Sequence, residues 1–166
     1  MTFLLRHYRS ADFDTLWRID QICFPPGIAY SQMELTGFVL RRNAITIVAE
    51  FEDLDGKEAT RASGFDPRIA GFAVAHPLRK VGRILTLDVL PSARRAGLGV
   101  GLMRECEKRL RARSCTEVYL ETAVNNEPAI KLYERLGYQI LRILPDYYGS
   151  HGLDAFRMGK RLDAAC

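Results

Sequence analysis

The chain alternates between short apolar runs and segments in which apolar residues recur every three or four positions. The first pattern predicts strands and the second predicts amphipathic helices. Strands are predicted over residues 3–8, 45–49, 70–75, 84–90, 118–120, 138–144 and 153–162. Helices are predicted over residues 10–22, 31–41, 98–110 and 126–137. This order indicates a mixed α/β fold, with an antiparallel meander that leads into a strand, helix, strand unit.

Local signals define the ends of several elements. Ser10 is expected to cap the first helix, whose apolar stripe is predicted to comprise Phe13, Leu16, Trp17 and Ile22. Ser31 and Glu34 form a capping box that opens the second helix. The polar connection over residues 52–68 is expected to be an extended, mobile hairpin loop without chemistry. A further loop is expected at residues 145–149, between the last two strands.

Composition narrows the class of protein. At 166 residues, with 48% hydrophobic and 27% charged residues, the chain is expected to form one globular domain over residues 1–166. Its apolar runs are shorter than the ~18 residues that cross a bilayer, and its first residues lack the apolar core of a signal peptide. We therefore expect a cytoplasmic protein that does not enter membranes. The sequence leaves the oligomeric state open.

Charge and cysteine usage add little chemistry. A formal net charge of +4 is modest and does not demand nucleic acid as a partner. The four cysteines contain no C-x-x-C pair and do not cluster with the three histidines. We expect reduced thiols and no metal site.

The segment from Arg94 to Gly101 is the most informative one. It follows the predicted strand 84–90 and runs into a helix, an arrangement that exposes backbone amides to a phosphate. A dinucleotide fingerprint does not fit, because Leu102 stands where the third glycine belongs, although Glu121 could pass for its acidic residue. The lysine-serine/threonine ending of a triphosphate loop is also missing. Glycines that merely tighten a turn beside solvated arginines remain the alternative to a pyrophosphate site.

Two segments together resemble the GNAT acetyltransferase superfamily. Arg94-Arg95-Ala96-Gly97-Leu98-Gly99 matches its R/Q-x-x-G-x-G/A acetyl-CoA loop. The run from Asn126 to Tyr138 is similar to its N-x-x-A-x-x-L-Y-x-x-x-G-F/Y segment. The resemblance covers essentially the whole chain. It implies a mixed, mostly antiparallel sheet of about seven strands with about four helices, whose splayed central strands form the acetyl-CoA cleft.

The resemblance also implies an N-acetyltransferase with acetyl-CoA as cosubstrate. Expected cofactor-binding residues are Leu87, Val89, Arg94, Arg95, Ala96, Gly97, Leu98, Gly99, Val100, Gly101 and Asn126. Tyr133 would be the acid that protonates the coenzyme A sulfur, unless it is an ordinary core aromatic. Glu121 would be the base that takes the amine proton, often through water, unless it is a solvated strand-end carboxylate. Asp88 is the second candidate base, at a position where relatives carry a small or apolar residue.

Two aromatic segments resemble those that enclose a peptide in protein N-terminal acetyltransferases, including the type that acts on a ribosomal protein's terminal alanine. Expected acceptor-binding residues are Phe24, Pro25, Tyr30, Tyr147 and Tyr148, with Asp88 beside them. The acceptor would then be the α-amine of a peptide or protein. Acetylation of a small-molecule amine, or acyl-CoA binding without catalysis, are the alternatives.

Overall fold

The computed structural model describes residues 2–52, 64–149 and 152–163. Its strands are β1 (Phe3–His7), β2 (Ile45–Phe51), β3 (Ile69–Leu78), β4 (Val81–Val89), β5 (Glu117–Ala123), β6 (Gln139–Tyr148) and β7 (Leu153–Arg161). Its helices are α1 (Phe13–Cys23), α2 (Gln32–Val39), α3 (Leu98–Ala112) and α4 (Glu127–Arg135). Short 3₁₀ turns precede α1 and α3, at Ser10–Asp12 and Pro91–Ala93. The predicted connection 52–68 lies largely outside the described residues, since its positions 53–63 are not among them.

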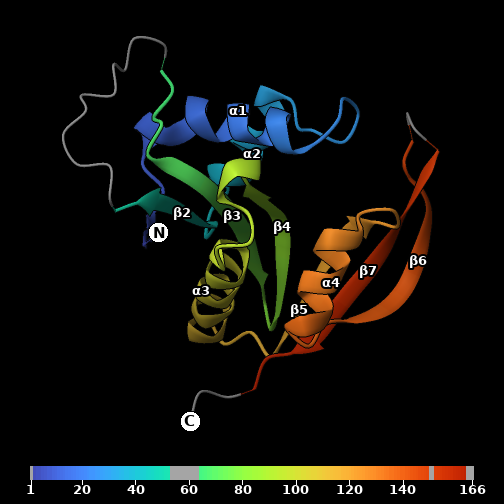
Figure 1. Ribbon diagram of the computed structural model, residues 1–166. Helices are drawn as coiled ribbons and strands as arrows, with labels where there is room; N and C mark the ends of the chain where they lie inside the picture. Colours follow the sequence, from blue (N-terminus) through green and yellow to red (C-terminus); the bar gives the residue numbers. More distant parts are fainter. Residues whose placement is uncertain (1, 53–63, 150–151, 164–166) are drawn as a thin grey trace.

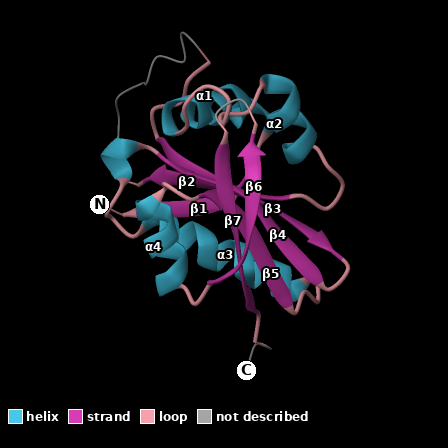
Figure 2. Cartoon of the chain, turned by 90° about the vertical axis from the view of Figure 1, so that its right-hand side faces the viewer, coloured by secondary structure: helices cyan, strands magenta, loops and turns pink. Residues whose placement is uncertain are grey.

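The strands form one seven-stranded sheet in the order β1-β2-β3-β4-β5-β7-β6. Neighbouring strands are antiparallel except β4 and β5, which run parallel. The predicted fold class is therefore confirmed. The sheet lies between two pairs of helices, with α1 and α2 over one face and α3 and α4 over the other (Figures 1 and 2).

Side-chain alternation along the central strands gives each face its own core. On β2, Val48 packs with Leu16 and Leu35 under α1 and α2, whereas Ile47 packs with Leu102 under α3. Strand residues one position apart point to opposite faces, so a near-continuous apolar run is needed where both faces are covered. The fully buried stretch of β2 and β3 meets that requirement.

The structure corrects three sequence-based predictions. Helix α1 begins at Phe13 rather than at a Ser10 cap, because the Asp12 carboxylate accepts hydrogen bonds from the Arg9 amide and the Arg6 guanidinium. Ile22 is 56% exposed and does not belong to the buried stripe of α1, which instead includes Ile19.

The third correction concerns residues 145–149. Strand β6 continues through Pro145 to Tyr148 instead of ending in a loop at Leu144. Its pairing with β7 shifts register between Leu144 and Tyr148, and Asp146 has a positive φ of 48°. An edge strand accommodates proline at such an irregularity, because one side of the strand has no partner to lose. The sequence predicts a loop here because Pro145, Asp146 and Gly149 are turn-forming residues.

Candidate active site

The parallel pair β4 and β5 separates shortly after it begins. Pairing is limited to Val81 with Glu117, Gly82 with Val118 and Arg83 with Tyr119. Beyond Arg83, β4 keeps β3 as its partner but has no ladder with β5. We call this region, residues 84–89 of β4 and 120–123 of β5, the fork. Its inner edge on β4 includes the backbone of Leu87 and Val89, which suits the amide-rich arm of coenzyme A.

The glycine-rich turn lies at the upper end of β4 and opens α3. Gly97 is the N-cap of α3 with a left-handed φ of 78°, and Arg95 also has a positive φ, 67°. Such a succession turns consecutive amides toward one side. Among the described residues, the backbone amides from Arg95 to Val100 have no backbone acceptor, whereas the Gly101 amide donates to Gly97 O at 3.0 Å. Free amides at a helix N-terminus fit a pyrophosphate.

Gly99 fixes the close approach of α3 to α4. A Cβ at this position would lie 3.2 Å from Leu132 Cδ2. By contrast, a Cβ at Gly97 would meet nothing within 4 Å. The first glycine of the turn is thus needed for its backbone conformation and the second for space.

Asn126 stands at the start of α4, where its side chain caps the helix by accepting from the Ala129 amide at 3.4 Å. The oxygen of this side chain therefore has an intramolecular role in addition to the expected contact with the cofactor arm. Its amide NH₂ group is the part left to donate to a ligand.

Tyr133 is 7% exposed and packs into the core under α3 and α4. Its ring lies 5.9 Å from that of Tyr138. Burial, then the nearby charge of Asp88, raise the pKa of Tyr133. The phenol therefore stays protonated at neutral pH and is available as a proton donor.

Asp88 faces the α1 side of β4 and is fully buried. Its Oδ1 accepts from Thr86 Oγ1 at 2.5 Å, and its carboxyl group lies close enough to Asp20 on α1 for each group to shift the pKa of the other. Burial, followed by the charge of Asp20, raises the pKa of Asp88 well above its ordinary value. Asp20 is fully buried as well, and desolvation raises its pKa too.

One oxygen of each carboxyl, Asp88 Oδ2 and Asp20 Oδ1, lacks a hydrogen-bond partner among the described residues when both groups are ionised. A single proton shared between the two carboxyls supplies the missing bond and removes one buried charge. Asp20 Oδ2 also accepts from the Tyr30 amide at 2.7 Å. The pair thus ties the segment after α1 to the cofactor strand.

Glu121 lies on β5, inside the fork, with a side chain that is 4% exposed. Its Oε1 accepts from Arg157 at 2.8 Å, and its Oε2 forms an ion pair with Arg83 at 3.2 Å. It is therefore not a solvated carboxylate. Guanidinium groups therefore contact both oxygens of the Glu121 carboxylate.

Three tyrosines lie close together near β4, on the side of the fork where the acceptor is expected to bind. The rings of Tyr147 and Tyr148 on β6 meet edge to face, with their centres 4.9 Å apart. Burial raises the pKa of Tyr30, and Tyr147 and Tyr148 lie close enough to add to this shift. The Tyr30 hydroxyl donates to Leu85 O at 3.1 Å. Phe24 caps the end of α1 and is half-buried, whereas Pro25 is exposed. The structure brings the tyrosines together and leaves Phe24 and Pro25 at the start of the same connecting segment.

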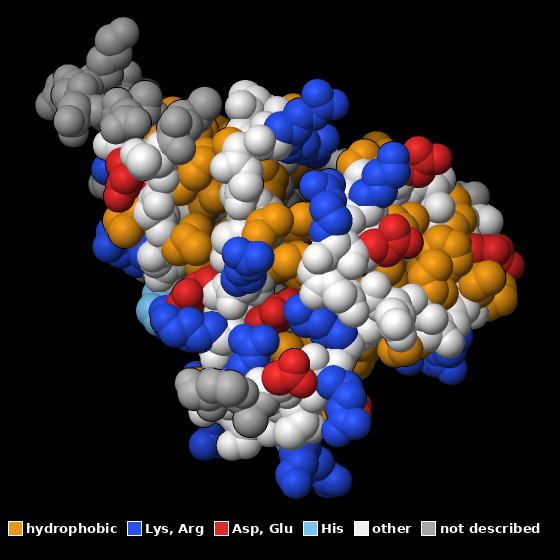
Figure 3. Space-filling view, turned by 60° about the horizontal axis from the view of Figure 1, so that its bottom comes forward, with side chains coloured by type: hydrophobic (Ala, Val, Ile, Leu, Met, Phe, Trp, Pro, Cys, Tyr) orange, Lys and Arg blue, Asp and Glu red, His pale blue; other side chains and the backbone are white. Residues whose placement is uncertain are grey.

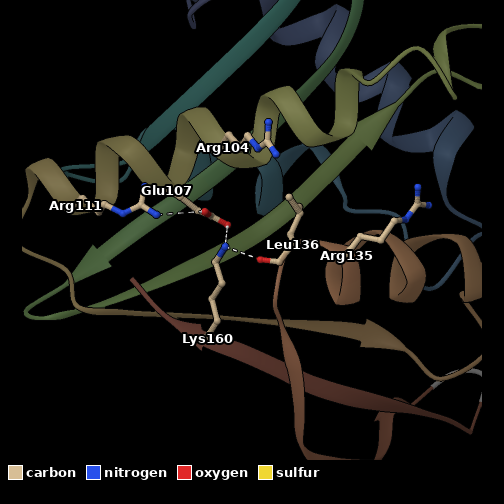
Figure 4. A pocket seen from close by; sticks show the side chains of 6 residues that line it. All are labelled: Arg104, Glu107, Arg111, Arg135, Leu136 and Lys160. Atoms are coloured by element: carbon tan, nitrogen blue, oxygen red, sulfur yellow. Dashed lines mark hydrogen bonds and ion pairs between the residues drawn. The ribbon is translucent and has the colours of Figure 1, made fainter. Parts of the chain in front are cut away.

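A basic pocket of about 410 Å³ lies elsewhere, between α3, α4 and β7 (Figure 4). Glu107 at its centre is held by Lys160 at 2.9 Å and by the Tyr138 hydroxyl at 2.9 Å. Lys160 also donates to Leu136 O, so the network ties α3 and the end of α4 to β7. Basic side chains are spread over this end of the molecule with acidic ones among them (Figure 3). These bonds give the Glu107 network a structural role.

Comparison with known proteins assigns the family. Residues 13–138 match the Acetyltransferase (GNAT) family. The chain belongs to this family. It is 31% identical over 165 residues to an N-alpha-acetyltransferase from Sulfurisphaera tokodaii, covering 96% of this chain and 93% of that protein.

Solved structures agree on the fold. The ribosomal-protein-S18-alanine N-acetyltransferase from Escherichia coli superposes with a TM-score of 0.80 at 20% identity, covering 99% of this chain and 97% of that one. Arabidopsis thaliana NAA60 in complex with acetyl-CoA superposes with a TM-score of 0.82 at 22% identity, covering 97% and 99% of the two chains. The resemblance to N-terminal acetyltransferases seen in the sequence is confirmed, and the chain is an enzyme of the GNAT N-acetyltransferase family.

Sequence reasoning missed three residues of this site, namely Asp20, Arg83 and Arg157. Asp20 was hidden in an amphipathic helix, where an acidic residue normally faces solvent. Arg83 and Arg157 look like ordinary solvated arginines of a chain with 24 Lys and Arg. The only available signal was strand parity, because Tyr119 and Glu121 share a face of β5 and Arg83 pairs with Tyr119.

No helix in the described part of the chain is long and apolar enough to span a membrane. The described residues also contain no group of three or more His, Cys, Asp or Glu side chains arranged to hold a metal ion.

Proposed function

We propose that this enzyme transfers the acetyl group of acetyl-CoA to the α-amine of a peptide or protein N-terminus. The observation that carries the proposal is the meeting of two features at the fork. Free amides of the glycine-rich turn and Tyr133 lie on its α3–α4 side, and Tyr30, Tyr147 and Tyr148 lie on its acceptor side. The names of the relatives support the same acceptor class.

In this proposal, the amides from Arg94 to Gly101 bind the pyrophosphate of acetyl-CoA, with Arg94 and Arg95 adding positive charge. The backbone of Leu87 and Val89 pairs with the pantetheine arm, and the Val89 amide polarises the thioester carbonyl. Asn126 donates to the same arm. Acetyl-CoA supplies an acetyl group already activated as a thioester.

Tyr133 is the proposed acid that gives its proton to the sulfur of the leaving group. Its raised pKa keeps it protonated until a thiolate is formed beside it. Glu121 is the proposed base and acts through a water molecule. Because its two oxygens are held by two guanidinium groups, we propose that Glu121 orients this water, which takes the amine proton and releases it to bulk water.

The choice of acceptor reduces what the base has to do, because much of the acceptor amine is already neutral. An α-amine has a pKa of ~8, so a substantial fraction is neutral near physiological pH, whereas a lysine amine at ~10.4 is almost fully protonated. Direct attack by a neutral amine then needs only late removal of one proton. A peptide N-terminus therefore suits this site better than a lysine side chain.

The test is release of thiol from acetyl-CoA, measured against one panel of peptides with free N-termini and a second panel of small-molecule amines. The proposal expects turnover with peptides and loss of turnover when the peptide N-terminus is blocked. Turnover restricted to small amines would overturn the assignment of the acceptor. Binding of acetyl-CoA without turnover on either panel would favour a non-catalytic acyl-CoA-binding protein.

A further inference from the structure

The ion cluster around Glu121 carries more positive than negative charge. Arg83 bonds to Glu121 Oε2 through Nε at 3.3 Å, and Arg157 bonds to Oε1 through Nε and Nη2 at 3.2 and 2.8 Å. Two guanidinium groups thus share one carboxylate. Among the described residues, no other acidic side chain forms an ion pair with either arginine. Within the part of the chain that the structure describes, one positive charge of the cluster remains without a counter-ion.

The surplus charge lies at the acceptor side of the fork. Arg83 belongs to the last pair of the β4–β5 ladder, so its side chain stands where the two strands separate. It also donates to the Tyr147 hydroxyl at 3.3 Å, which connects the cluster directly to the aromatic acceptor surface. Glu121, Arg83 and Arg157 all influence the pKa of Tyr147, after burial as the main cause.

Both arginines remain accessible. Their side chains are 36% and 30% exposed, whereas Glu121 between them is 4% exposed. The centre of the Tyr119 ring lies 5.9 Å from the guanidinium carbon of Arg83 and 5.0 Å from that of Arg157, so the ring packs against both groups. Each guanidinium has five N–H groups in a fixed plane. For both arginines, Nη1 has no hydrogen-bond partner among the described residues.

We infer that Arg83 and Arg157 select acceptors that carry a carboxylate side chain in the first two residues of the peptide. The inference rests on the proposed function and names its substrate class. A carboxylate placed beside the cluster would receive charge-assisted hydrogen bonds from the free N–H groups and neutralise the surplus charge. Glu121 is the residue that holds the two guanidinium planes in position. An acceptor with lysine or arginine at the same place would be repelled.

The nearby acidic pair does not cancel this field. Asp20 and Asp88 are fully buried on the α1 side of β4. A proton shared between them would leave the pair one negative charge in total. That charge has its own basic neighbour in Arg94, whose charge acts on Asp88.

The test compares matched peptides that differ only in charge, with glutamate or glutamine at position 1, and separately at position 2. For the wild-type enzyme we expect kcat/KM to be at least about tenfold higher for a glutamate peptide than for its glutamine partner at one of these positions, the size of one charged hydrogen bond. The ratio should fall as salt is raised, because the surplus charge is partly exposed.

Arg157→Gln should bring this ratio close to one, and Arg157→Lys should restore part of it. The ratio is measured within each variant, so a general loss of catalysis cancels out. Arg161→Gln is the matched control, since it removes the same charge from the same strand about 13 Å further along at ~3.3 Å per residue. It should leave the ratio unchanged. Circular dichroism and acetyl-CoA binding establish that each variant is folded.

The outcomes separate the two proposals. Turnover of peptides with a glutamate to glutamine ratio near one in the wild type overturns the inference and leaves the proposed function standing. An acidic preference that persists in Arg157→Gln and in Arg83→Gln also overturns it. If no peptide with a free N-terminus is acetylated, the proposed function itself fails.

Discussion

At the scale of single residues, the most unusual feature is a fully buried carboxyl group, that of Asp88, on the strand proposed to bind the cofactor. Thr86 donates to one oxygen of Asp88, and we expect a proton shared with Asp20 to satisfy the other oxygen. Folding at neutral pH must therefore take up a proton that the unfolded chain does not hold. The buried pair therefore destabilises the fold as the pH rises, so its pKa can be measured from the pH dependence of the free energy of unfolding.

Asp88→Asn is expected to stabilise the protein increasingly as pH rises. Because the pKa of Asp88 is raised, the protonated carboxyl contributes its full stabilisation of the fold below the pKa of the unfolded chain, near ~4. This stabilisation is lost as the pH rises to the pKa of Asp88 in the folded protein. An asparagine keeps the oxygen for Thr86 and donates an N–H to Asp20 without titrating. The free energy of unfolding of the variant relative to wild type should grow by up to about 1.4 kcal/mol per pH unit across this window. Urea unfolding at several pH values measures it.

The exposed Asp14 on α1 supplies the control. Asp14→Asn should leave the pH dependence of stability unchanged. Equal slopes for wild type and Asp88→Asn would show that Asp88 is ionised in the folded protein, and the shared proton would then be ruled out.

Tyr133→Phe separates chemistry from binding. Removing the hydroxyl should lower kcat by about 10²- to 10⁴-fold, the usual contribution of a positioned acid, because the thiolate would then leave without a proton. The ring remains to fill the core position, so the dissociation constant for acetyl-CoA should change little. Steady-state kinetics and calorimetric titration give the two quantities. A variant with full activity would assign the proton to another donor.

At the scale of elements, the predictions succeeded where local chemistry and packing agree. Helix α3 was predicted correctly, because Leu98, Leu102 and Cys106 lie on a helical stripe and are all buried. Strand β4 begins three residues before its predicted start and ends one residue before its predicted end. Its first residues include Gly82, which is required by contact with Leu110 rather than by strand propensity. Asp20 and Asp88 could not be paired from the sequence, because they lie 68 positions apart and only the fold brings α1 against β4.

Gly71 illustrates such a tertiary constraint. A Cβ at this position would lie 2.5 Å from Asp88 O and 3.2 Å from Val89 Cα, so the backbone of the cofactor strand would have to move. Gly71→Ala is therefore expected to destabilise the protein by about 1–3 kcal/mol and to weaken acetyl-CoA binding. Gly37→Ala, in exposed helix α2 with open space around it, should instead stabilise by about 0.5–1 kcal/mol. Thermal unfolding of both variants measures the two changes in stability. Equal changes would show that the β4 backbone can move without an energetic penalty.

At the scale of the whole molecule, the chain has two parts joined along a short seam. Strands β1 to β4 with α1 to α3 form one part, and β5 to β7 with α4 form the other (Figure 1). The ladder between them is limited to the first residues of β4 and β5. Additional links come from Glu107 to Lys160 and from Arg83 to Glu121. Because the fork opens along this seam, a cofactor seated in it would touch both parts and hold them together.

Saturating acetyl-CoA is therefore expected to stabilise the folded protein by about 2.7 kcal/mol at a concentration 100 times the dissociation constant, as for any ligand that binds only the native state. Hydrogen exchange should slow in β4, in the turn from Arg94 to Gly101 and in β5 together, since one ligand spans the seam. Arg94→Ala should reduce the stabilisation at the same concentration, because the variant loses a cation beside the pyrophosphate. Arg18→Ala, an exposed position on α1, controls for the loss of one positive charge. Protection confined to the glycine-rich turn would mean that the ligand binds at the helix N-terminus without entering the fork, and the seam would then play no part in cofactor binding.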